Sequence, residues 1–241
     1  MITTARTPAA RERVPMSAAR KTALVAGGLY LLTFVSIPTL ALYGPVKGPG
    51  YIAGPGPDSA ALLGGLLETI VALACIGTAV ALYPVVKRQN EGVALAFVGA
   101  RVLEAATIFA GVASLLTIVS LRQAGAGADA LVTGQALVAQ YDWLFRLGQG
   151  ILPAVNALLL GSLLYRSGLV PRVLPLVGLI GAPLLLASQA ATVLGLWGPV
   201  SVLAAVAVLP IALWELSLGV YLVARGFRPS PIATDLAGPA R

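Results

Sequence analysis

The feature that most constrains this chain is an apolar run, Val93–Leu121, that carries the charged residues Arg101 and Glu104 near its middle. Such a run exceeds the roughly 20 residues that an α-helix needs to cross the hydrocarbon core of a bilayer. A charge in the middle of a membrane helix costs about 2.5–3.5 kcal/mol on insertion scales, so it normally faces the bundle interior and finds a partner. The run therefore predicts a membrane helix with one face in a polar interior.

The composition agrees with a protein surrounded by lipid. Of the 241 residues, 58% are hydrophobic and only 10% are charged, and the mean hydropathy is +0.92. A soluble domain usually has about 25% charged residues, so this chain has too few to cover a water-exposed surface. The net charge of +7 does not indicate nucleic-acid binding, because no basic stretch is interleaved with aromatic residues. We expect membrane lipids as partners and no nucleic acid.

Six apolar runs are long enough to span a bilayer, and we predict an all-α bundle of six transmembrane helices. Residues 1–22 are predicted to form a disordered basic tail, and residues 225–241 a second tail. The first run is longer than the apolar core of a signal peptide, and Pro38 predicts a kink in it. A short interfacial helix is expected at residues 130–140. The predicted spans are residues 23–43, 60–86, 93–121, 141–165, 173–196 and 200–224.

The basic residues outside these spans predict the orientation. One side of the membrane would hold both tails and the turns with Lys87, Arg88, Arg166 and Arg172. The other side would hold only Lys47 and Arg122. Because Lys and Arg are enriched in cytoplasmic loops, we expect both termini in the cytoplasm and the protein in the bacterial inner membrane.

Two layers of polar residues are predicted inside the bundle. Arg101 and Glu104 are three residues apart, on one helix face, and Glu215 lies at a similar depth in the sixth span. Nearer the outside, Glu68 and Arg146 form a second layer with Gln189 at comparable depth, and a Glu68–Arg146 pair is predicted if the charges only fix helix packing. Five residues of the fourth span share one face by their spacing, which predicts a polar funnel open to the outside: Asp142, Arg146, Gln149, Pro153 and Asn156.

The charge count of this interior suggests two kinds of function. Glu68, Glu104 and Glu215 face only two arginines within the spans, so one carboxylate lacks a partner. A protonatable group of that kind suits a protein that binds or transports a small solute or protons. Alternatively, the charges only fix helix packing in a non-catalytic structural or partner-binding membrane protein. An intramembrane enzyme acting on a lipid head group is a third interpretation.

The chain has no histidine and a single cysteine, Cys75. This excludes catalysis that depends on histidine as the base, a His-ligated haem, a Cys/His zinc site and a disulfide within the chain. The three membrane glutamates lack the spacing of metal ligands. We predict no catalytic residue, no metal site and no cofactor.

Several motifs resemble a bacterial membrane-protein family known as domain of unknown function 4386, over roughly residues 20 to 227. The resemblance implies a small multi-pass inner-membrane protein and assigns no activity. It places Arg101, Glu104, Asp142, Asn156 and Glu215 inside family motifs. The motifs are ALYPVVKRQNEG at 81–92, GARVLEA at 99–105, YDW at 141–143, NALLLG at 156–161, LYRSGLVPR at 164–172, GLIG at 178–181 and WELSLG at 214–219.

Overall fold

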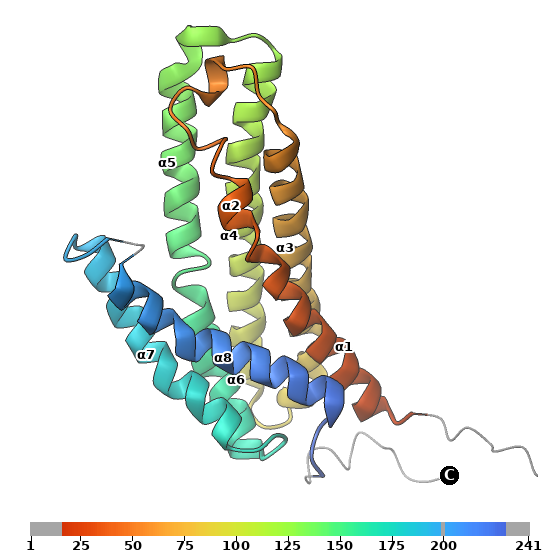
Figure 1. The fold of residues 1–241 in the computed structure, drawn as a ribbon. Helices are drawn as coiled ribbons and strands as arrows, with labels where there is room; N and C mark the ends of the chain where they lie inside the picture. The colour runs from red at the N-terminus through yellow and green to blue at the C-terminus, as the bar shows by residue number, and fades with distance from the viewer. Residues whose placement is uncertain (1–15, 199–200, 230–241) are drawn as a thin grey trace, which may run out of the picture.

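The computed structural model describes residues 16–198 and 201–229, and over these residues the chain is helical with no strand (Figure 1). Six helical segments of this part are long and apolar enough to cross a membrane, which confirms the predicted all-α, six-span architecture. The α-helices are α1 (Ala18–Leu32), α2 (Thr39–Leu42), α3 (Ser59–Val86), α4 (Glu91–Gln123), α5 (Leu131–Leu147), α6 (Leu152–Ser167), α7 (Val173–Val193) and α8 (Val202–Ala224), with 3-10 turns η1 (Thr33–Ser36), η2 (Tyr51–Ala53) and η3 (Gly127–Ala130).

The helices form a closed ring in which α1, α3, α4, α6, α7 and α8 each pack on the next and α8 packs back on α1. Figure 1 shows α3, α4 and α5 side by side, with the α7–α8 hairpin tilted across them. The described chain ends lie at one end of the ring with the α3–α4 and α6–α7 turns, and we call this the tail end. The opposite end, with the 43–58 segment and the α4–α5 turn, is the loop end.

Specific polar contacts hold the tail end together. The Arg20 guanidinium donates to the Leu222 and Val223 carbonyl oxygens at 2.9 and 2.6 Å, so it bonds the otherwise unpaired last carbonyls of α8. Arg20 was expected in a tail, but α1 begins at Ala18 and includes it. At the start of α4, the Asn90 side chain accepts a hydrogen bond from the Val93 amide at 3.0 Å.

The first span differs from the expected continuous helix over residues 23–43. The α-helix ends at Leu32 and is followed by the 3-10 turn η1. An α-helical conformation returns only in the single turn α2, after Pro38. Proline lacks an amide hydrogen and its ring crowds the preceding turn, so Pro38 favours a break here, although α3, α7 and α8 each continue through a proline. The Thr33, Ser36 and Thr39 hydroxyls each donate to a carbonyl three residues earlier, which satisfies backbone oxygens at the break.

The fourth span also differs from its predicted bounds of 141–165. No separate interfacial helix precedes it in the described chain, because α5 runs unbroken over residues 131–147. The helix is instead interrupted at residues 148–151, before α6. A Cβ atom on Gly148 would lie 2.0 Å from the Thr107 hydroxyl of α4, so this close approach requires glycine. Pro153, in the first turn of α6, restarts the helix.

The largest core of buried apolar residues fills the tail-end half of the ring. It joins all six packed helices and includes Tyr30, Leu82, Phe97, Leu160 and Leu218. Trp214 of α8 is 1% exposed and lies against Gly178 of α7, where an added Cβ atom would come within 2.8 Å of the indole ring. The core therefore depends on small residues between α7 and α8.

We predict that Gly178→Ala lowers the free energy of unfolding by about 1–3 kcal/mol, because the new methyl group overpacks the core against Trp214. The matched control is Gly99→Ala on α4, where an added Cβ atom meets nothing within 4 Å. That substitution should stabilise the helix by about 0.5–1 kcal/mol. Thermal melting of the two purified variants measures both effects, and equal melting temperatures would contradict the packing described.

Candidate functional site

Arg101 of α4 is the centre of a buried charge cluster and is only 1% exposed. Its Nη1 donates to Glu104 Oε2 at 2.9 Å and its Nη2 donates to Glu215 Oε1 of α8 at 3.3 Å. Glu104 Oε2 also accepts from Asn156 Nδ2 of α6 at 2.8 Å. The structure thus brings together the predicted layer of Arg101, Glu104 and Glu215 and adds Asn156. We call these four residues the Arg101 cluster.

The two carboxylates of the cluster differ in how completely they are bonded. Glu104 is on the same helix as Arg101, takes two short hydrogen bonds, and has a side chain that is 6% exposed. Glu215 takes one longer hydrogen bond, and its side chain is 16% exposed. Glu104 is therefore fixed within the protein, whereas Glu215 keeps part of its carboxylate free for another partner.

Aromatic rings and a thiol surround the rest of the Arg101 guanidinium. Its Cζ lies 5.0 Å from the centre of the Tyr30 ring and 5.9 Å from that of Phe97, and Nη1 lies 3.6 Å from Cys75 Sγ. These contacts stabilise a cation in place of water. Sequence reasoning missed Tyr30 and Phe97, because an aromatic residue in an apolar run carries no mark of its partner.

A cavity of about 510 Å³ opens beside the Arg101 cluster, and we call it the central cavity. Arg101, Glu104 and Glu215 line its floor, together with Cys75. Gln149 and Gln189, both predicted site residues, line it as well. This volume falls within the range of about 300–1,000 Å³ that is typical of small-molecule sites.

The walls of the central cavity come from the two helix breaks and from α8. Thr33 to Ile37 contribute from the break after α1, and Gly150 and Pro153 from the break between α5 and α6. On α8 the lining residues extend from Ala204 to Glu215, which are about 16 Å apart along the helix. Ile37 and Val208 line the cavity and are exposed, so we call their side of the cavity its mouth, whereas the buried core fills the tail-end half of the bundle.

Glu68 of α3 belongs to a second buried polar group, nearer the loop end. Tyr43, Tyr141 and Gln149 donate hydrogen bonds to its carboxylate at 3.1, 3.4 and 3.2 Å. Glu68 is 1% exposed, and the two tyrosine rings pack edge to face with centres 5.4 Å apart. Gln149 contacts Glu68 and also lines the central cavity, so it links the two polar groups.

The predicted pair between Glu68 and Arg146 is wrong for the described chain. The Arg146 guanidinium lies over the Trp143 ring on its own helix, 5.2 Å from the ring centre. The interruption at residues 148–151 explains this result, because the predicted common face of Asp142, Arg146, Gln149, Pro153 and Asn156 assumed one continuous helix. Tyrosine hydroxyls take the place of the arginine at Glu68.

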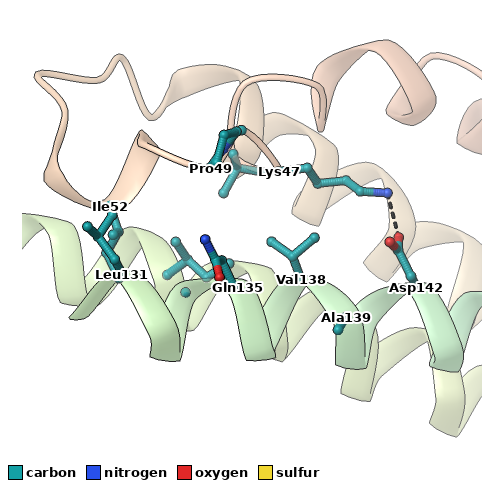
Figure 2. Close-up of a pocket in the computed structure, with 12 residues that line it drawn as sticks. Lys47, Pro49, Ile52, Leu131, Gln135, Val138, Ala139 and Asp142 are labelled. Carbon is teal, nitrogen blue, oxygen red and sulfur yellow. Dashed lines mark hydrogen bonds and ion pairs between the residues drawn. The ribbon is translucent and has the colours of Figure 1, made fainter. Parts of the chain in front are cut away.

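Asp142 lies away from the central cavity, at a separate pocket of about 320 Å³ that we call the outer pocket. Figure 2 shows the Lys47 side chain reaching from the 43–58 segment along α5 to Asp142. Lys47 Nζ and Asp142 Oδ1 are 2.5 Å apart, and both side chains are more than one-third exposed. This ion pair holds the 43–58 segment against α5, and Tyr43 of that segment contacts Glu68. Asp142 therefore positions the segment.

The other end of the same segment is held by Asp58, which sequence reasoning did not single out. Its carboxylate accepts hydrogen bonds from Arg122 of α4, from the Tyr51 hydroxyl and from Gln123, the last at 2.8 Å. These donors, Arg122 above all, lower the pKa of Asp58 from 3.8 to about 2. The loop end is therefore closed by two ionic contacts, Lys47–Asp142 and Asp58–Arg122.

The family model of the domain of unknown function DUF4386 matches residues 25–226 of the chain. The chain belongs to this family. The match contains all six membrane helices apart from the first residues of α1, and it includes both polar groups. Searches of curated proteins and of solved structures found no match. The family assignment thus agrees with a multi-pass membrane protein and names no activity for the DUF4386 fold.

We predict that the Asp58 contact stabilises the protein at neutral pH and is lost in acid. Because the folded pKa of about 2 lies below the ordinary 3.8, the contribution is complete above pH 3.8 and disappears as the pH falls toward 2. Melting temperatures measured from neutral to acidic pH should show Asp58→Asn below wild type at neutral pH, with the gap closing in acid. A gap that stays constant down to about pH 2 would contradict the assignment.

Proposed function

We propose that this protein binds a small solute or protons in the central cavity, as a binding or transport protein of the bacterial inner membrane. The observation that supports the proposal is the position of Glu215: a carboxylate in the middle of a membrane helix lines a cavity and is only partly bonded. Charged groups inside the membrane are costly and commonly mark ligand or ion pathways. The excess of basic residues at the tail end supports cytoplasmic termini.

The residues of the site have different roles in this proposal. Arg101 and Glu104 form the fixed floor, because both are almost completely buried and bonded to each other. Glu215 is the group that exchanges partners, and Gln149 and Gln189 offer amide donors and acceptors on the walls. The buried core fills the tail-end half of the bundle, and the exposed lining residues Ile37 and Val208 mark one opening of the cavity.

The alternative is a non-catalytic structural or partner-binding protein whose charges only fix helix packing. Glu104 fits this interpretation, since its two hydrogen bonds tie α4 to itself and to α6. Glu215 does not fit it equally well, because its carboxylate takes a single hydrogen bond, at 3.3 Å, and its side chain is 16% exposed. The two glutamates therefore distinguish the two functions.

We predict opposite effects of Glu104→Gln and Glu215→Gln on thermal stability. Glu104→Gln weakens two hydrogen bonds to a carboxylate and should lower the free energy of unfolding by about 1.5–3 kcal/mol. Glu215→Gln relieves repulsion between two buried carboxylates at the cost of one long contact. The free energy of unfolding of Glu215→Gln should equal that of wild type within about 0.5 kcal/mol or exceed it. Residues at functional sites are often kept although they lower stability.

Melting of purified protein in lipid nanodiscs measures both variants. Asp129→Asn, which removes an exposed carboxylate in η3 outside the cavity lining, is the matched control. If Glu215→Gln melts as far below wild type as Glu104→Gln, both glutamates are structural and the proposed function fails.

A further inference from the structure

The charges around the central cavity do not balance. Among the residues that line it in the described chain, Arg101 has the only positive side chain, whereas Glu104 and Glu215 are both acidic. One guanidinium bonds both carboxylates, so with both ionised the floor has an excess negative charge. An uncompensated charge is costly in an apolar environment, and a bound cation removes that cost.

The unused hydrogen-bonding groups also favour a ligand that donates hydrogen bonds. Of the four Glu104 and Glu215 carboxylate oxygens, the described contacts place Arg101 and Asn156 donors on only two. Asn156 is 2% exposed, and its Oδ1 is buried without a donor in the described chain. Arg101 Nε is the one buried donor of the cluster that lacks an acceptor. Asn156 does not line the cavity, but at the floor itself the described contacts leave Glu104 Oε1 and Glu215 Oε2 as two free acceptors against one free donor, as an ammonium group requires.

The walls and mouth of the cavity are apolar. The wall side chains include Phe34, Val71, Phe145, Leu185 and Ile211. Ile37 and Val208 line the mouth and are 62% and 42% exposed on the outer surface of a membrane-spanning helix bundle. A molecule dissolved in the hydrocarbon of the bilayer meets these side chains first. Apolar walls with a few polar groups at one end suit an amphipathic ligand.

We infer that the central cavity takes an amphipathic cation from the membrane, with an ammonium group at Glu215 and a hydrocarbon body along the apolar walls. The inference rests on the proposed function of this cavity and specifies the class of its ligand. Glu215 supplies the charge complement, and Arg101 and Glu104 hold the floor in place. Cys75 is the sole cysteine of the sequence, lines the cavity and is 1% exposed, so a thiol reagent must enter the cavity to modify it and a bound ligand should slow that modification.

The test measures the rate at which N-ethylmaleimide modifies Cys75 in nanodiscs, with the melting temperature read in parallel. The four probes are decylamine, decanol, decanoate and butylamine. Decylamine should slow modification about tenfold at ten times its dissociation constant and raise the melting temperature. Decanol and decanoate test whether the ligand must be positively charged. Butylamine stays in water and tests whether the ligand enters the cavity from the membrane. All three should protect far less.

Two variants make the result specific. In Glu215→Gln, protection by decylamine should fall to the level of decanol, whereas Asp129→Asn should behave like wild type. Equal protection by decanol would show that charge is not recognised, stronger protection by decanoate would make the ligand an anion, and equal protection by butylamine would make it a water-borne amine. Each of these results overturns the inference, as does the absence of protection by every probe.

This outcome can be separated from failure of the proposed function. If no probe protects Cys75 but Glu215→Gln melts at or above wild type, the ligand class is wrong and the cavity remains a candidate binding site. If Glu215→Gln melts far below wild type, the proposed function fails as well.

Discussion

The main physical constraint in this bundle is the charge balance at one buried guanidinium, which two carboxylates on different helices share. Arg101 is 1% exposed, and its hydrogen bonds are made to carboxylates inside the protein. Glu104 supplies the nearest partner from the same helix, and Glu215 reaches the same guanidinium from α8 at 3.3 Å. The longer contact leaves Glu215 incompletely bonded beside the central cavity.

Helix breaks create the space that the charge cluster faces. Pro38 ends the first helix early, and the close approach of Gly148 to Thr107 interrupts the fourth span. Non-helical backbone at membrane depth is tolerated where it lines a cavity or is buried in protein, and both breaks line the central cavity. The ion pairs Lys47–Asp142 and Asp58–Arg122 hold the 43–58 segment at the loop end. This segment covers the Glu68 group.

The sequence predicts the membrane spans and the central charge layer because both follow from local rules. Apolar length defines the six helices, and the spacing of Arg101 and Glu104 places them on one face. The partner of Glu68 could not be predicted in the same way. The common face through Arg146 requires a continuous helix. Gly148 interrupts the helix where it contacts Thr107 of α4, a residue that is distant in the sequence. Tyrosine donors such as Tyr43 and Tyr141 look like ordinary apolar residues in the sequence.

The most direct measurement of the central claim compares the melting temperatures of Arg101→Gln alone and of Arg101→Gln combined with Glu104→Gln and Glu215→Gln. The single variant leaves two buried carboxylates without their cation, which should cost about 3–5 kcal/mol. The triple variant removes all three charges and should recover most of that loss. If the triple variant melts no higher than the single one, Arg101 does not balance the charge of these two carboxylates.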